Sequence, residues 1–148
     1  MSMFEMIRSQ LAGAVPFAGL AGVEVVEIGL GRAVARLVQR PELGNHIGTL
    51  HAGALFTLGE AASGGAMIGA FADRIMQVRP VAADARITFG RPATGTVTAT
   101  ATCSEAADAL KATLDAQGKV CFAVTVDITD EQSASVAGMV VVWHVRKT

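Results

Sequence analysis

The sequence predicts an α+β fold in which a curved antiparallel sheet wraps around one long buried helix. Residues 52–72 are apolar all round and rich in Ala and Gly, which is typical of a helix surrounded by other structure. Stretches of alternating hydrophobicity lie on both sides of this segment, and the later ones follow one another closely enough to pair antiparallel. The 148 residues contain no internal repeat or linker, so we expect a single domain over residues 1–148.

The part before the central helix predicts one helix and two strands. In chain order we expect a helix over about 3–12, a strand over 23–28, a glycine turn at 29–31, a strand over 32–40 and a loop over 41–49. Phe4, Ile7 and Leu11 give the first segment its helical spacing. In the second strand, Ala33 and Ala35 face one way and the intervening arginines face the other, so the arginines are expected on the surface.

The central helix is predicted over about 51–73, and four strands and a short helix follow it. The strands are expected over 81–89, 96–103, 120–128 and 133–145, and the short helix over 104–117. Ser104 is expected to cap this helix and Gly118 to end it. Lys111 and Asp115 are four residues apart and are expected to pair across one turn.

Charged residues are few in this chain. They make up 17% of it, or 25 residues, whereas a soluble domain of this length carries about 37. We therefore expect part of the surface to be hidden against another copy. The net charge of −1 gives no basic surface for nucleic acid. Cys103 and Cys121 form no metal or disulfide pattern, so we expect small buried side chains in a reducing, cytoplasmic compartment.

Two apolar segments must be distinguished from targeting and membrane sequences. Residues 11–23 look like the apolar part of a signal peptide, but Glu5 stands where a positive charge is expected and Pro16 interrupts the run. In residues 52–72 a central carboxylate opposes insertion into lipid by about 2.5–3.5 kcal/mol. We therefore expect a buried helix there, in which Gly65 and Gly69 let other backbone approach closely.

The polar segment 45–53 leads directly into the central helix and is the first candidate site. A helix amino terminus presents free N–H groups and partial positive charge, so it can bind an anion or polarise a carbonyl. Asn45 and Thr49 can also serve only as caps of the turn, and both interpretations stay open. His46 and His51 flank the helix entrance, whereas His144 lies in the last predicted strand and is expected to be structural.

Glu60 is the only charged residue in the 21-residue apolar segment 52–72. A buried carboxylate needs a partner or a raised pKa, so Glu60 is either half of an ion pair with an arginine or a general base or nucleophile. It follows His51 by nine residues, roughly 13.5 Å along a helix. One substrate carbonyl cannot contact both the helix start and Glu60 of the same chain, so a single site that uses both requires two antiparallel chains. The same separation opposes a metal site formed by the histidines and Glu60, and no metal is expected.

The segment from Asn45 to Glu60 resembles the hotdog-fold acyl-CoA thioesterases, in particular the branch similar to phenylacetate-pathway proteins. That family carries an Asn, a Gly-Thr-hydrophobic-His-Gly-Gly run and an acidic residue nine positions after the His. The corresponding residues here are Asn45, Gly48, Thr49, Leu50, His51, Gly53 and Glu60. Residues 84–93 resemble the family's next strand, which ends in a Pro-Ala turn. The order of predicted elements agrees with a hotdog fold over about residues 16–145.

The resemblance implies a role for each part of this segment. Asn45 would orient the thioester or the attacking water. The backbone N–H groups near Ala52 and Gly53 would polarise the thioester carbonyl. Glu60 of the partner chain would be the base or nucleophile, and His51 would shape the loop or bind the carbonyl region.

The resemblance also implies that coenzyme A binds across a subunit interface. It would be part of the substrate, so no separate cofactor is expected. Its phosphates would lie near Arg91, Arg79 or Arg86, each of which can otherwise be a solvated surface charge. We expect a homodimer or a dimer of dimers, and no nucleic-acid or membrane partner.

Two departures from the family pattern leave other functions open. Ala52 replaces the second residue of the His-Gly-Gly run, although an alanine with negative φ still offers its N–H. Many relatives carry Ser or Thr near the position of Ala82, where this chain has only Val81, Ala82 and Ala83. The sequence predicts a thioesterase acting on a small or medium acyl-CoA. The alternatives are a non-catalytic acyl-CoA-binding protein and a dehydratase of enoyl or hydroxyacyl thioesters.

Overall fold

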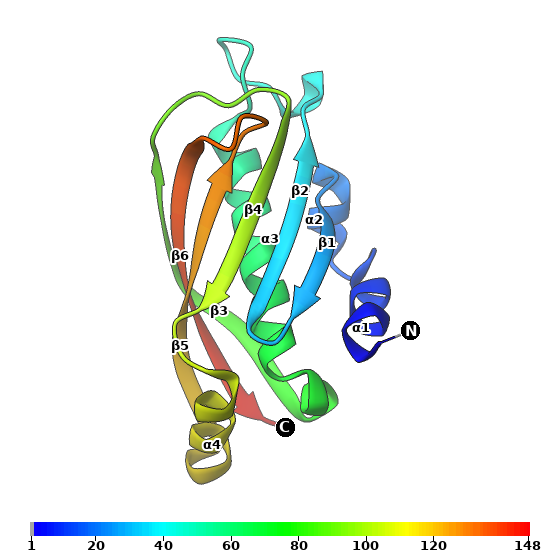
Figure 1. The fold of residues 1–148 in the computed structure, drawn as a ribbon, viewed down its shortest axis with the longest axis vertical. Helices are drawn as coiled ribbons and strands as arrows, with labels where there is room; N and C mark the ends of the chain where they lie inside the picture. Colours follow the sequence, from blue (N-terminus) through cyan, green and yellow to red (C-terminus); the bar gives the residue numbers. More distant parts are fainter. Residues whose placement is uncertain (1) are drawn as a thin grey trace.

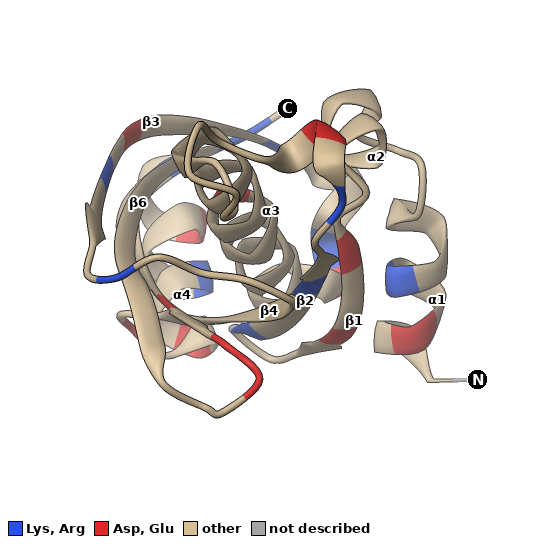
Figure 2. Ribbon diagram, turned by 90° about the horizontal axis from the view of Figure 1, so that it is seen from above, with Lys and Arg blue, Asp and Glu red and all other residues tan. Residues whose placement is uncertain are grey.

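The computed structural model describes residues 2–148 and confirms a curved antiparallel sheet around a central helix. The elements are α1 (Met3–Leu11), α2 (Pro16–Ala21), β1 (Glu24–Gly29), β2 (Arg32–Val38), η1 (Pro41–Leu43), α3 (Ala52–Ala70), η2 (Ala72–Gln77), β3 (Val78–Phe89), β4 (Thr96–Cys103), α4 (Ala107–Gln117), β5 (Lys119–Thr129) and β6 (Ser135–Lys147). The six strands lie in the order β1-β2-β4-β5-β6-β3, and each neighbouring pair is antiparallel. Figure 1 shows α3 lying along the sheet, and Figure 2 shows from above how the strands curl around it.

The core lies between α3 and the inward faces of the strands. Leu58, Ala62 and Ala66 of α3 have no exposed surface. The strand residues facing them alternate as predicted, and the buried ones include Ala33, Ala35 and Leu37 in β2, Val97, Ala99 and Ala101 in β4, Phe122 and Val124 in β5, and Val141 and Val145 in β6. The Trp143 indole of β6 donates a hydrogen bond of 3.0 Å to the Ser63 hydroxyl of α3. No helix in the described part of the chain, residues 2–148, is long and apolar enough to cross a membrane.

Gly65 and Gly69 allow the β1–β2 hairpin to approach α3, as predicted. A Cβ atom at Gly65 would lie 2.9 Å from the Cβ of Ala33. A Cβ atom at Gly69 would overlap the carbonyl oxygen of Gly29, where β1 turns into β2. Larger side chains at these positions would therefore push the hairpin away from the helix.

The clearest differences from the prediction are one additional helix and two shifted boundaries, while other strand ends move by about two residues. The apolar segment after α1 forms α2, which has Pro16 in its first turn and ends at Gly22, where φ is +87°. The central helix ends at Ala70 rather than near residue 73, because Phe71 leaves helical geometry (φ −111°, ψ 24°) and η2 follows. β3 begins at Val78 instead of residue 81, since its first residues already pair with the end of β6. Pro80 is tolerated there because β3 is an edge strand.

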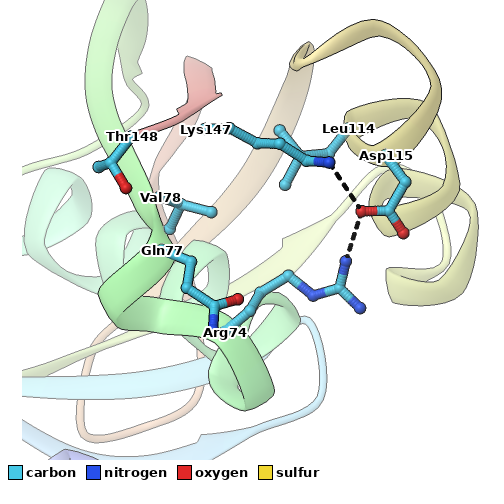
Figure 3. Close-up of a pocket in the computed structure, with 7 residues that line it drawn as sticks. All are labelled: Arg74, Gln77, Val78, Leu114, Asp115, Lys147 and Thr148. Atoms are coloured by element: carbon cyan, nitrogen blue, oxygen red, sulfur yellow. Dashed lines mark hydrogen bonds and ion pairs between the residues drawn. The ribbon is translucent and has the colours of Figure 1, made fainter.

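The predicted cap and ion pair of α4 are both wrong. The helix begins at Ala107 after Ala106, which offers no side-chain cap, so Ser104 lies outside it. Asp115 does not pair with Lys111; it contacts Arg74 at 2.9 Å and Lys147 at 3.5 Å around a pocket of about 280 Å³ (Figure 3). Lys111 instead reaches Asp73 of η2 at 3.3 Å. Arg74 belongs to η2 and Lys147 to β6. The ion pairs therefore hold α4 against one end of the curled sheet.

We predict opposite stability changes for two glycine substitutions in α3. Gly69→Ala forces the methyl group against the rigid carbonyl of Gly29 and should destabilise the fold by about 1–3 kcal/mol. Gly64→Ala places its methyl 3.5 Å from the Trp143 ring, an ordinary contact, and should be neutral or stabilising by up to about 1 kcal/mol. Urea unfolding of both variants measures the difference, and equal stability of the two would contradict this account of the packing.

Candidate functional site

Asn45 shapes the segment that leads into α3. Its Oδ1 accepts hydrogen bonds from the N–H groups of Ile47 (3.1 Å) and Thr49 (2.9 Å). Its Nδ2 donates to the Thr49 hydroxyl (2.7 Å) and to the Leu50 carbonyl (3.3 Å). Both ends of the amide are therefore used inside the loop, as the capping interpretation of Asn45 and Thr49 expects.

His51 is the N-cap residue of α3, and its side chain binds the Gly53 N–H, one of the two N–H groups expected to polarise the thioester carbonyl. Its Nδ1 accepts a hydrogen bond of 2.8 Å from the Gly53 N–H. The Ala52 N–H finds no acceptor within residues 2–148. Ala52 is exposed at the first turn of the helix, so its N–H is the one that remains available to a bound carbonyl or anion.

A cavity of about 340 Å³ lies at this end of α3 and brings several predicted residues together. Its lining consists of Asn45, Ile47, Thr49, Leu50, Ala52, Leu55, Phe89, Gly90, Arg91, Pro92 and Ala93. The Leu50 N–H donates to the Ala93 carbonyl at 2.8 Å, which joins the loop before α3 to the turn after β3. Ile47 and Phe89 were not predicted as site residues. The only sequence signal for Ile47 is a large apolar side chain in an otherwise polar loop.

Glu60 lies elsewhere on the same helix. It is about two and a half turns from His51, roughly 13.5 Å along the axis of the continuous helix α3. Its side chain is half-buried, and this burial raises the pKa of the carboxyl above its ordinary value. Within residues 2–148 no Lys, Arg or His lies within ion-pair distance of it. The predicted alternative, an ion pair with an arginine, is thus not formed in the described part of the chain.

The remaining predicted residues are dispersed. Arg91 lines the cavity, whereas Arg79 and Arg86 are exposed on β3 outside it. His46 is exposed in the loop before α3, and His144 is half-buried in β6. No three His, Cys, Asp or Glu side chains in residues 2–148 are grouped so that they could hold a metal ion.

One side of α3 and the inward face of β3 are left open. The partly exposed residues of α3 recur every three or four positions, and they include Thr57, Glu60 and Gly64. On β3, Ala82 and Ala85 are exposed, although their partners on β6, Trp143 and Val141, are buried. The outer edge of β3 pairs with no strand in residues 2–148. Glu60 therefore lies on a surface that residues 2–148 do not cover.

Residues 5–145 match a family model described as "Domain of unknown function (DUF4442)". No curated protein matches the chain. Protein PA5026 of Pseudomonas aeruginosa, described as of unknown function and a probable thioesterase, is 26% identical with a TM-score of 0.84. The match covers 97% of this chain and 95% of that one.

Two further solved structures have the same fold at lower identity. The PaaI protein of the E. coli phenylacetic acid degradation operon is 22% identical with a TM-score of 0.72, over 99% of this chain and 94% of that one. A mutant of the Staphylococcus aureus thioesterase SAV0944 is 18% identical with a TM-score of 0.71, over 89% and 99% of the two chains. These neighbours are thioesterase-like hotdog proteins, which confirms the predicted fold and the family resemblance.

The two cysteines differ, which corrects one prediction. Cys103 is partly buried beside the Ala66 carbonyl, and burial raises the pKa of its thiol to about 11. Cys121 is exposed, so the expectation of a buried side chain is wrong for it. It occupies an outward position of β5 between the inward-facing Val120 and Phe122.

We predict that a thiol reagent distinguishes the two residues. At pH 8 only about one in a thousand Cys103 thiols is ionised, so the native protein should react quickly at one thiol, Cys121. In Cys121→Ser, rapid labelling should disappear and return only on unfolding. Spectrophotometric titration with Ellman's reagent measures both results, and a fast-reacting thiol in native Cys121→Ser would contradict the prediction.

Proposed function

Because the chain belongs to the DUF4442 family and folds like thioesterase-related hotdog proteins, we propose that it is an acyl-CoA thioesterase for a small or medium acyl group. The observation that carries the proposal is Glu60. Its carboxylate is half-buried, has no cationic partner within residues 2–148 and has a pKa raised by burial. A raised pKa brings a carboxylate towards the range in which it acts well as a general base.

The proposed reaction is hydrolysis of the thioester. Water attacks the carbonyl carbon while Glu60 takes a proton from it, and the carbon–sulfur bond then breaks. That proton passes to the leaving thiolate, so the products are a carboxylic acid and free coenzyme A. In the nucleophilic variant, the Glu60 carboxylate attacks the carbonyl carbon and expels the coenzyme A thiolate. Water then hydrolyses the resulting mixed anhydride, which restores the Glu60 carboxylate, and a proton from that water passes to the thiolate.

The start of α3 is the proposed binding place for the thioester carbonyl oxygen. The Ala52 N–H has no acceptor within residues 2–148, and the helix dipole adds to the polarisation of a carbonyl bound there. Because Asn45 and His51 hold neighbouring backbone in place, we propose them as positioning residues for this donor. The Gly53 N–H is part of this support, since it is held by His51.

The complete site is proposed to form between two copies. Roughly 13.5 Å separates the helix start from Glu60, so one carbonyl cannot contact both within a chain. The open side of α3 and the unpaired edge of β3 offer a self-complementary surface for a two-fold pair. With the two α3 helices antiparallel, the amino terminus of each lies towards the partner's Glu60. The assembly is thus a homodimer or a dimer of dimers.

Coenzyme A is proposed to enter at the cavity beside the helix start. Arg91 is the cation among the residues lining that cavity, so it is the first candidate for a phosphate contact at its mouth. Ile47 and Phe89 supply an apolar lining, as a pantetheine or acyl chain requires. The acyl-CoA is the substrate, and the proposal includes no separate cofactor.

A non-catalytic acyl-CoA-binding protein is the second candidate. It is favoured by the Asn45 amide, which is fully used within the loop, and by Val81, Ala82 and Ala83, which offer no hydroxyl group to place a water. Thermal stabilisation by acyl-CoA esters without any turnover would support this candidate and contradict the thioesterase.

We predict that Glu60→Gln lowers thioester hydrolysis by about 100-fold or more, because the base is lost. Activity of the unaltered protein should rise with pH through the raised pKa of Glu60, since only the ionised carboxylate accepts a proton. A raised pKa also means that the Glu60 contribution to stability is present at low pH and is lost as pH rises through that pKa. Glu60→Gln should therefore become relatively more stable than the unaltered protein towards neutral pH.

The matched control for Glu60→Gln is Glu105→Gln, which alters an exposed carboxylate outside the proposed site. Hydrolysis of an acyl-CoA panel and urea unfolding at pH 4 to 8 measure the two effects. Full activity of Glu60→Gln would remove Glu60 from the mechanism.

We predict that two inactive variants restore activity when their subunits are mixed. Ala52→Pro removes the free N–H at a helix position where proline is tolerated, and His51 already has the extended backbone that a following proline requires (φ −65°, ψ 145°). Alone it should lose about 100-fold to 1000-fold in kcat. When Ala52→Pro is unfolded and refolded with an equal amount of Glu60→Gln, half of the dimers contain one chain of each variant and carry one intact site. About one quarter of the activity of the unaltered protein should therefore return.

In this mixing test the control is each variant refolded with itself, which should stay inactive. Absence of recovery in proven mixed dimers would contradict a site shared between two chains.

A further inference from the structure

Three cations form one row on the outer face of the sheet. Arg146 of β6 lies directly opposite Lys119 of β5 on one side and Arg79 of β3 on the other. Directly opposed residues of antiparallel strands point to the same face. That face is the outer one, because the neighbouring Val120 and Val145 point into the core and all three cations are exposed.

This row lacks the acidic partners that the arginines of β2 have. On β2 of the same sheet, Arg32 is paired with Glu27 and Arg36 with Glu24. Within residues 2–148 no carboxylate lies within ion-pair distance of Arg79, Lys119 or Arg146. Like charges placed directly opposite each other destabilise a sheet. The row thus costs stability and contributes no compensating ion pair in the described chain.

The dimensions of the row fit a compact polyanion. Neighbouring strands are about 4.8 Å apart, so the three backbone positions span roughly 10 Å. Two or three phosphate groups of one small molecule can contact cations over that width, and arginine binds phosphate through two parallel hydrogen bonds. We propose that Arg79, Arg146 and Lys119 form a binding site for the phosphate groups of a nucleotide, which, if the proposed function holds, is the nucleotide part of the acyl-CoA.

The position of the row agrees with the proposed two-fold pair. Arg79 lies at the start of β3, whereas Phe89 and the cavity lie at its end. Antiparallel pairing of two β3 edges places the start of one β3 beside the end of the other. The row of each chain then lies near the partner's cavity, on the face that the pairing leaves open to solvent.

Binding of adenosine 3′,5′-bisphosphate tests the site without turnover. Calorimetry should give affinity that falls with added salt and that Arg146→Ala and Lys119→Ala each weaken by about tenfold. The matched control is Arg36→Ala, an exposed arginine of the same sheet that is paired with Glu24, and it should bind as the unaltered protein does. Absence of binding to the unaltered protein, or unchanged binding by Arg146→Ala, overturns the proposal.

A stability measurement separates loss of the site from loss of the fold. Because removing one of three opposed like charges relieves repulsion, the midpoint of thermal unfolding of Arg146→Ala should stay the same or rise. A marked fall in that midpoint would show that the row supports the fold, which also contradicts the proposal.

Kinetics with two substrates identify the source of the phosphates. If they belong to the substrate, Arg146→Ala should raise KM about tenfold for the coenzyme A thioester and leave KM for the corresponding pantetheine thioester unchanged. If the bisphosphate binds more weakly but both KM values are unchanged, the row binds a separate nucleotide and its assignment to the substrate is overturned. Failure of the unaltered protein to hydrolyse either thioester overturns the proposed function. The calorimetry still shows whether the row binds the bisphosphate.

Discussion

The close contact between α3 and the sheet that curls around it is the constraint on which the rest of the structure depends. A helix can lie this deep only if its residues are small where the strands come nearest, and Gly65 and Gly69 meet the β1–β2 hairpin at distances that leave no space for a Cβ atom. Such a helix has little room for polar groups. Its amino terminus and Glu60, its one charged side chain, therefore stand out against an apolar background.

Rigidity follows from the same packing. The helix is held by buried contacts along its length and by the hydrogen bond between Trp143 and Ser63, so its amino terminus and Glu60 keep a fixed separation. No rearrangement inside one chain brings them to a common substrate atom. A catalytic use of both features consequently depends on the surface that α3 and β3 leave uncovered.

Local patterns in the sequence predicted most of the fold, because buried apolar residues recur at every second position of β2, β4, β5 and β6. They failed for Lys111 and Asp115, whose partners come from η2 and β6 and are distant in the chain. The sequence could suggest Asn45 as a site residue but could not show that its amide is used within the loop. Ala82 and Ala85 look like core residues, and their exposure could not be predicted because it reflects the absence of any covering element within residues 2–148.

The free edge of β3 also bears on solubility. A strand of 12 residues with an unpaired edge is a template for indefinite addition of further chains, and the few charges of this protein offer little protection. Asp84, Arg86 and the irregular register between Ala82 and Asp84 interrupt the edge near its middle. Two-fold pairing uses each edge once and leaves none for a third chain, whereas a staggered pairing would continue into a fibre. In the proposed two-fold pair, closed symmetry would therefore keep a sparsely charged protein from polymerising through the edge of β3.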